Sequence, residues 1–181
     1  MWKWMMPMAA LVTGLTIASG CATAPPSAEG KAALSQDVNT ALAEAKVQDP
    51  SLQAFLDRAY AYAIFPTVGK GAIGVGGAYG KGEVFERGKQ IGYCDLSQAT
   101  IGLALGGQSF TEIIAFENKA ALEEFKTGNL KFTAQATATA LKAGASSNAE
   151  YADGVSVLTA NPAGLMAEAS IGGQTFSFQP L

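Results

Sequence analysis

Residues 69–82 read Gly69-Lys-Gly-Ala-Ile-Gly-Val-Gly-Gly-Ala-Tyr-Gly-Lys-Gly82, and this stretch decides the fold class. Glycine recurs at every second or third position. Because each glycine inside a helix costs about 1 kcal/mol relative to alanine, a stable helix is excluded here. Apolar residues such as Ile73 and Val75 alternate with glycine, which is the period of a β-strand. The stretch therefore predicts extended chain with close backbone contacts.

The same stretch contains the pattern G-x-G-x-x-G at Gly69, Gly71 and Gly74, which is also found in dinucleotide-binding turns. Such a turn requires a helix that begins within it, so that backbone N–H groups meet a pyrophosphate. Here more glycines and alternating apolar residues follow instead. We interpret the pattern as part of a strand, and we expect no nucleotide cofactor.

Helices are predicted on both sides of the glycine-rich stretch. Apolar residues at helical spacing predict a first helix at about 31–45. Asp49 as N-cap and Pro50 at the first helical position predict a second helix, which ends near Tyr62. A short third helix is expected at Lys119–Lys126, with Gly128 as its C-terminal cap.

The remaining segments alternate between apolar and polar residues and are bounded by glycines, which predicts strands. They lie at 72–79, 83–85, 90–95, 100–106, 110–116, 132–140, 154–160, 164–170 and 175–178, with a turn at Arg87-Gly88. We therefore expect an α+β fold in which the helices pack on a mostly antiparallel, glycine-rich curled sheet. Glycines at corners allow strong curvature, so a barrel-like form is one alternative.

The first twenty residues have the pattern of a bacterial lipoprotein signal peptide. Lys3 gives a positive start, an apolar stretch follows to about Ile17, and small residues precede Cys21. The apolar stretch is shorter than the roughly 20 residues that a bilayer span requires. We expect residues 1–20 to be removed and acyl chains such as palmitate to be attached to Cys21. Cleavage by an ordinary secretory peptidase, without acylation, is the alternative.

Residues 21–30 contain two prolines and mostly small residues and are expected to form a flexible tether, with an end-to-end distance of roughly 17 to 19 Å. Residues 31–181 are expected to form a single domain, because the 161 residues left after cleavage suffice for one core. Acylation of Cys21 would leave Cys94 as a lone thiol in an apolar stretch. We interpret Cys94 as buried and unreactive.

Basic residues concentrate in one segment of an otherwise acidic chain. Without Lys3, 11 basic residues face 15 acidic ones, and the net charge of −4 argues against a nucleic-acid partner. Residues 58–89 are positive by contrast, with a net charge of +3. Its basic residues are the candidate contacts to lipid headgroups: Arg58, Lys70, Lys81, Arg87 and Lys89. Ordinary solvated charge on loops is the alternative interpretation.

Residue types suited to catalysis are scarce. The chain has no histidine, so a hydrolytic triad or a zinc site would require unusual substitutes. Glu123 and Glu124 lie on the predicted third helix, where solvation explains them, and Glu112 and Glu117 flank an apolar run. We expect no enzymatic activity, no cofactor and no metal.

Several separated motifs occur in an order that resembles the SYLF domain family, also called YSC84-like. The matching segments are 61–66, 68–71, 74–80, 92–96, 101–108, 164–173 and 176–178, so the resemblance covers roughly residues 30–180. The family includes eukaryotic proteins that bind membrane phosphoinositides, yeast forms that bind actin, and many bacterial lipoproteins. The resemblance implies binding of lipid or membrane, not catalysis.

The resemblance is weaker at the segment associated with lipid binding in the animal members, an amphipathic stretch at the start of the domain. The corresponding residues, about Lys31 to Ala45, contain Lys31 as their single base together with Asp37 and Glu44. Strong recognition of anionic lipid is therefore not expected of this helix. Actin is not an expected partner of an exported bacterial chain.

Together these features predict a membrane-anchored lipoprotein with a SYLF-like domain that binds lipid or phospholipid without catalysis. Its expected partners are membrane lipids, including anionic phospholipid. Because Ala22 rather than aspartate follows Cys21, we expect attachment to the outer membrane, facing the periplasm, in a cell with two membranes. The alternative is a structural or protein-interaction lipoprotein of the cell envelope, with an envelope protein as partner.

Overall fold

The computed structural model describes residues 23–73, 75–101, 106–133, 137–160 and 168–181. The predicted signal peptide and Cys21 lie outside these residues. The elements in chain order are α1 (Ala28–Gln48), α2 (Leu52–Arg58), β1 (Ala61–Ile73), β2 (Val75–Glu86), β3 (Lys89–Ile101), β4 (Gly106–Phe116), α3 (Lys119–Lys126), β5 (Thr137–Ala140), a short 3-10 helix η1 (Ser146–Asn148), β6 (Val155–Ala160), β7 (Glu168–Ser170) and β8 (Gln174–Pro180).

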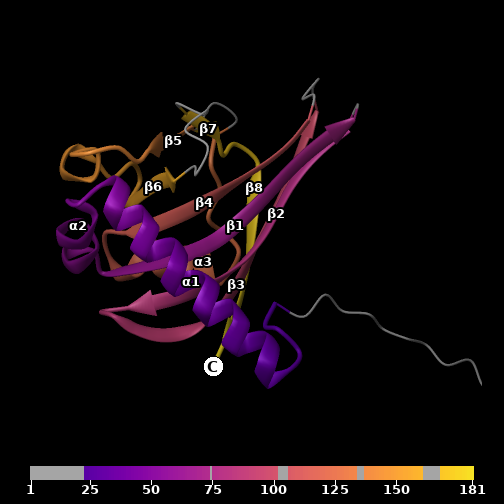
Figure 1. Ribbon diagram of the computed structural model, residues 1–181, viewed down its shortest axis with the longest axis horizontal. Helices are drawn as coiled ribbons and strands as arrows, with labels where there is room; N and C mark the ends of the chain where they lie inside the picture. Colours follow the sequence, from indigo (N-terminus) through magenta and orange to yellow (C-terminus); the bar gives the residue numbers. More distant parts are fainter. Residues whose placement is uncertain (1–22, 74, 102–105, 134–136, 161–167) are drawn as a thin grey trace, which may run out of the picture.

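The strands form one sheet in the order β7-β5-β6-β4-β1-β2-β3-β8 (Figure 1). Among the described residues β5 and β6 pair in parallel, and the other neighbouring strands pair antiparallel. The predicted α+β class is thereby confirmed. Within the described part of the chain no pairing joins β7 to β8, so the sheet is open there and the barrel-like form is not confirmed.

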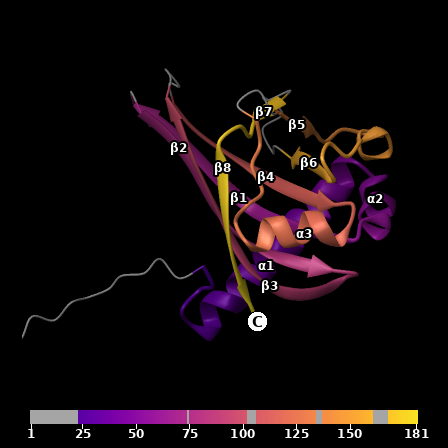
Figure 2. The same cartoon turned by 180° about the vertical axis from the view of Figure 1, so that it is seen from behind.

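Helices cover both faces of the sheet. Figure 1 shows α1 and α2 in front of the strands, and Figure 2, turned by 180°, shows α3 on the opposite face. Each face has its own apolar core, one around Leu52 and Ile113 below α1 and α2, the other around Phe116 and Phe125 below α3. Because β-strand side chains alternate, neighbouring residues such as Ile113 and Ile114 supply opposite cores.

The structure differs from two predicted boundaries at the first hairpin. The predicted second helix ends at Arg58 instead of near Tyr62, because β1 already begins at Ala61. The predicted strand 72–79 contains the end of β1 and the start of β2. Likewise, segment 100–106 contains the end of β3 and the first residue of β4, and residues 102–105 lie outside the described residues. Glycines inside β1 and β2 continue these strands instead of ending them.

Close packing explains at least one of these glycines. A Cβ atom at Gly82 would collide with the carbonyl oxygen of Ile64 on the neighbouring strand β1. The pairing of β1 with β4 contains a bulge at Pro66. The Pro66 carbonyl accepts a hydrogen bond from Thr111 Oγ1 at 2.9 Å. The bulge explains why Phe65 and Val68, at odd and even positions, both reach the same core.

The junction between α1 and α2 differs from the prediction. Asp49 does not cap a helix beginning at Pro50. Ser51 is the N-cap of α2, and Asp49 is the C-cap of α1. The Asp49 carboxylate is fully buried and instead accepts hydrogen bonds from Ser51, Gly144 N and Ser146 N.

Other predicted features are confirmed. Helix α3 has the predicted bounds, and Gly128 follows it with φ +71°. Arg87 and Gly88 form the turn between β2 and β3 with φ values of 50° and 77°, as a two-residue hairpin turn of type I′ requires. The predicted strand 132–140 is shorter, because β5 begins at Thr137. Residues 134–136 lie outside the described residues, as do 164–167 of the predicted strand 164–170.

The segment predicted as a flexible tether is partly ordered. Helix α1 begins at Ala28, with the side chain of Ser27 accepting a hydrogen bond from Gly30 N. Ala24 is only 4% exposed and belongs to the core below α1 and α2. The tether prediction is therefore wrong for residues 28–30, which are helical, and Thr23 and Ala24 contact the domain.

Candidate functional site

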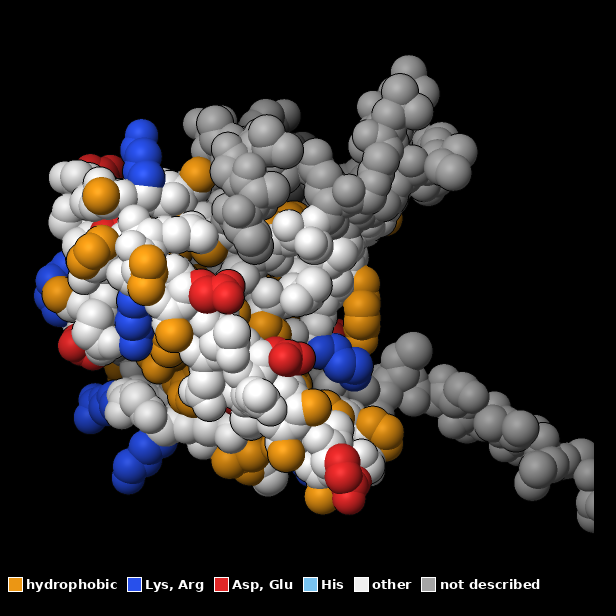
Figure 3. Space-filling model, in the orientation of Figure 1, with side chains coloured by type: hydrophobic (Ala, Val, Ile, Leu, Met, Phe, Trp, Pro, Cys, Tyr) orange, Lys and Arg blue, Asp and Glu red, His pale blue; other side chains and the backbone are white. Residues whose placement is uncertain are grey.

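Four basic residues from three separate segments lie near one end of the sheet, and we call this region the basic end; two of them, Lys46 and Arg87, line the same hollow. Lys46 lies in the last turn of α1, Arg58 is the last residue of α2, and Arg87 and Lys89 flank the β2–β3 turn. The turn is held against the end of α2, because Arg87 N donates to the Tyr60 carbonyl at 3.3 Å. Figure 3 shows lysine and arginine side chains projecting on the side of the molecule that carries α2 and this turn.

A hollow of about 260 Å³ opens at the basic end. Lys46 and Arg87 line it together with Asp57, and its apolar lining includes Leu56 and Tyr62. In the described part of the chain, the one ion pair within 4.0 Å joins Lys126 to Glu123, so none of the four bases of the basic end is neutralised by such a pair. The arrangement can receive an anionic group.

The Tyr60 side chain orders this region. Its hydroxyl donates to Glu86 Oε1 at 2.6 Å, and this hydrogen bond raises the pKa of Tyr60. The Arg87 guanidinium lies over the Tyr60 ring, 5.5 Å from its centroid. Arg87 therefore keeps an oriented side chain while remaining exposed.

The structure does not bring all five predicted headgroup contacts together. Arg58, Arg87 and Lys89 share the basic end. Lys70 pairs with Ala78 far along β1, about 30 Å beyond Ala61 at about 3.3 Å per residue. Lys81 lies between these positions on β2, and its amine donates to the Thr23 carbonyl at 3.0 Å.

Sequence reasoning missed Lys46 as a member of this site, because only the fold brings the end of α1 beside the β2–β3 turn. It also did not single out Val47, which is 82% exposed although apolar. In the sequence, the sign of this apolar group was a valine that directly follows a lysine. Scattered surface valines are common enough that this signal alone would not have sufficed.

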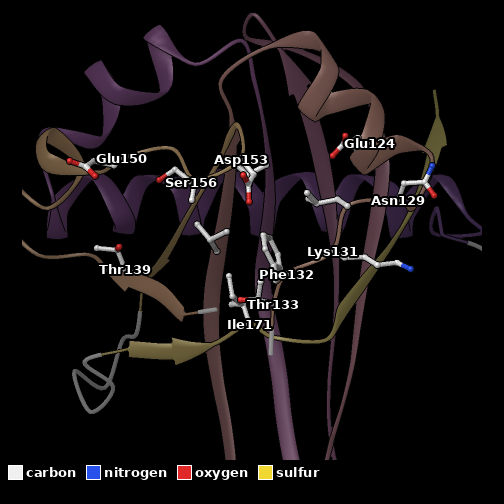
Figure 4. A pocket seen from close by; sticks show the side chains of 14 residues that line it. Glu124, Asn129, Lys131, Phe132, Thr133, Thr139, Glu150, Asp153, Ser156 and Ile171 are labelled. Atoms are coloured by element: carbon white, nitrogen blue, oxygen red, sulfur yellow. The ribbon is translucent and has the colours of Figure 1, made fainter. Parts of the chain in front are cut away.

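A larger cavity of about 560 Å³ lies on the other face of the sheet, between α3, residues 129–133 and strands β5 to β7. Its apolar lining consists of Leu130, Phe132, Val155, Val157 and Ile171. Four charged residues also border it: Glu124, Lys131, Glu150 and Asp153. Figure 4 shows Phe132 in the middle of the cavity, with Glu150 and the Lys131 amine on opposite sides. Nothing in the sequence predicted this cavity.

The buried ionisable groups are explained by packing. Cys94 is fully buried, as predicted, and burial raises the pKa of its thiol well above the ordinary value. Glu83 accepts a hydrogen bond from Ser35 Oγ at 2.5 Å, and burial raises its pKa. Glu112, which flanks an apolar run in the sequence, is fully buried and accepts a hydrogen bond from Gln174 Nε2 at 3.0 Å.

The described residues contain neither a metal-binding cluster nor a membrane-spanning helix. No group of three or more histidine, cysteine or acidic residues comes together there as a metal site would require. Nor does that part of the chain contain a helix long and apolar enough to cross a bilayer.

The fold and the site define an α+β protein with an open mixed sheet, helices on both faces and a basic end. No family model matches the chain. The chain is 28% identical over 150 residues to "Beta cell expansion factor A" of Aeromonas veronii. The match covers 82% of this chain and 57% of that protein. The chain thus spans a little more than half the length of this curated relative.

Proposed function

We propose that the chain is an exported lipoprotein, acylated at Cys21, whose folded domain binds membrane lipids without catalysis. The observation that carries the proposal is the basic end, where Lys46, Arg58, Arg87 and Lys89 from three segments lie near one end of the sheet without ion pairs among the described residues. The lipoprotein signal and the SYLF-like motifs of the sequence support it. Acylation would place the domain in the cell envelope, on the periplasmic face of the outer membrane in a cell with two membranes.

The charge of the basic end is sufficient for weak binding to an anionic surface. Each base near such a surface contributes about 1 kcal/mol, so four contribute about 4 kcal/mol. The negative charge of Asp57 reduces this sum, and salt screens the attraction between the bases and the lipid charges beyond about 8 to 10 Å. Weak binding is enough for a chain that its acyl groups already hold at the bilayer.

Vesicle flotation of the unacylated mature chain tests the basic end. The variant Arg87→Gln/Lys89→Gln should float less with vesicles of phosphatidylglycerol than the unaltered chain does. The matched control Lys131→Gln/Lys142→Gln removes the same charge elsewhere and should float as the unaltered chain does. Equal flotation of all three proteins would contradict the proposal for this surface.

A structural or protein-interaction lipoprotein is the second candidate. The observation that favours it is β8, which pairs with β3 and forms one end of the described sheet. An edge strand of this kind can add a strand from a partner protein. Crosslinking in cells separates the candidates, because one dominant protein adduct without copurifying lipid would support this function over lipid binding.

A further inference from the structure

The N-terminal segment Thr23–Ser27, which we call the strap, connects α1 to the residues that precede the domain. We propose that the strap fixes the orientation of the acylated protein, so that the side of the domain carrying the start of α1, the end of β8 and the β2–β3 turn faces the bilayer. This inference rests on the proposed lipid anchor at Cys21. A domain held by the strap presents a defined surface to the bilayer, whereas a loosely tethered domain would not.

The strap is held by contacts at both of its ends. Lys81 Nζ donates to the Thr23 carbonyl at 3.0 Å, and Ala24 N donates to Gln179 Oε1 at 3.1 Å. Ala24 itself is 4% exposed and lies in the apolar core below α1 and α2. At the other end, Ser27 caps α1. The strap therefore has a defined path on the domain.

The covalent chain leaves little freedom between the strap and the proposed anchor. Cys21 precedes Thr23 by two residues, and two extended residues span at most about 7 Å. The acylated cysteine would thus hold Thr23 within about 7 Å of the lipid headgroups. By comparison, the tether expected from the sequence would have let the domain move over roughly 17 to 19 Å.

The point where the strap docks also determines which surface meets the membrane. In Figures 1 and 2, the start of α1, the C-terminus and the β2–β3 turn lie along the lower side, whereas β5 and β7 lie on the upper side. Lys81 and Arg87 are separated by about 20 Å along β2 at about 3.3 Å per residue. One flat bilayer can therefore contact both the strap and the β2–β3 turn with Arg87 and Lys89, whereas Lys46 lies at the far end of α1.

This orientation has a consequence for the larger cavity. The cavity is lined by Glu124 of α3, residues 129–133, Thr139 of β5, residues of β6 and Ile171. Its side formed by β5 and β6 lies away from the lower side and would face the aqueous compartment in the anchored protein. A ligand of the cavity would then arrive from solution, whereas the β2–β3 turn would meet the bilayer directly.

Fluorescence quenching of the full acylated chain in vesicles of phosphatidylethanolamine and phosphatidylglycerol tests the orientation. A fluorophore is attached at Lys31→Cys, near the strap, or at Lys142→Cys, after β5, and the vesicles carry a nitroxide on the lipid headgroup. Both positions are exposed lysines, so the charge change is matched. Buried Cys94 and acylated Cys21 should not react with the dye. Quenching should be several-fold stronger at position 31 than at position 142.

The strap itself is tested by Gln179→Ala, which removes the acceptor of Ala24 N, with Ser177→Ala on the same strand as the control. Gln179→Ala should reduce the difference in quenching between the two positions, and Ser177→Ala should preserve it. If the protein stays on the vesicles and both positions are quenched equally, the proposed orientation is wrong. Loss of the unaltered chain from the vesicles would overturn the anchor, and with it this inference.

Discussion

Replacing Asp49 with alanine should destabilise the domain by about 3 to 6 kcal/mol, because this buried carboxylate joins the α1–α2 junction to the turn around η1. Its oxygens accept hydrogen bonds from Ser51 N at 3.0 Å, Ser51 Oγ at 2.6 Å, Gly144 N at 3.0 Å and Ser146 N at 2.6 Å. Alanine would leave these donors without their acceptor.

The magnitude follows from how well water can replace each lost bond. Only the bond from Ser146 N is fully buried, and its loss should cost about 1.5 to 3 kcal/mol, as for other hydrogen bonds to a charged group. The donors on Ser51 and Gly144 are partly accessible, so their loss should cost about 0.5 to 1 kcal/mol each. Asp49→Asn keeps one oxygen acceptor and should cost roughly half as much.

Urea unfolding of residues 21–181 followed by circular dichroism measures this effect, since this part of the chain lacks tryptophan. Burial alone would raise the pKa of Asp49, but its hydrogen bonds outweigh burial and hold the pKa well below the ordinary value. The contribution of Asp49 is therefore present above the unfolded pKa of about 3.9 and is lost as the pH falls toward the folded pKa. Asp57→Ala, at an exposed carboxylate, is the control and should cost less than about 1 kcal/mol. A loss below about 1 kcal/mol for Asp49→Ala would refute this reasoning.

Three further predictions concern the β2–β3 region. Because burial raises the pKa of Glu83, its protonated form stabilises the fold at low pH, and this stability is lost as the pH rises through the folded pKa. The variant Glu83→Gln keeps an acceptor for Ser35. It should raise the urea midpoint at neutral pH and flatten the pH dependence of that midpoint. Gly82→Ala should destabilise the domain by about 1 to 3 kcal/mol in the same assay, because its Cβ would press on the Ile64 carbonyl. The Cys94 thiol should resist alkylation in the folded chain and react in urea, and rapid reaction without denaturant would contradict its burial.

Local signals predicted the parts of the fold that local interactions determine. Helix α3 was bounded correctly because Gly128 ends it in a left-handed conformation, and the Arg87-Gly88 turn follows from glycine chemistry. The start of β1 was missed because Ala61 and Ala63, which favour helices, alternate there with residues of strong strand preference such as Tyr62. Pairing with β2 and β4 on both sides decides their conformation.

The candidate site was predicted only in part, because its composition depends on long-range packing. Arg58, Arg87 and Lys89 were recognised from their clustering in the sequence. Nothing local indicated that Lys46 would join them, or that Lys70 would lie about 30 Å away along β1. Charge counted along the chain therefore overestimated the size of the basic surface and omitted one of its members.

Packing of the strap was also invisible in the sequence. Ala24 and its proline neighbours lack the periodicity of a helix or strand, so composition alone favoured a flexible tether. The structure places Ala24 in a core position because Gln179, at the far end of the chain, supplies an acceptor for its backbone N–H. A contact across almost the whole sequence cannot be read from either segment by itself.

Intact-mass spectrometry of the protein extracted from membranes with its bound material tests the central claim most directly, because it reports the anchor and the ligand together. The proposed function predicts a chain that begins at Cys21, carries the added mass of acyl chains and copurifies with phospholipid. A chain that begins at another residue, or that carries an unmodified Cys21, would contradict the lipid anchor. Acylation without any copurifying lipid would instead favour the protein-interaction function.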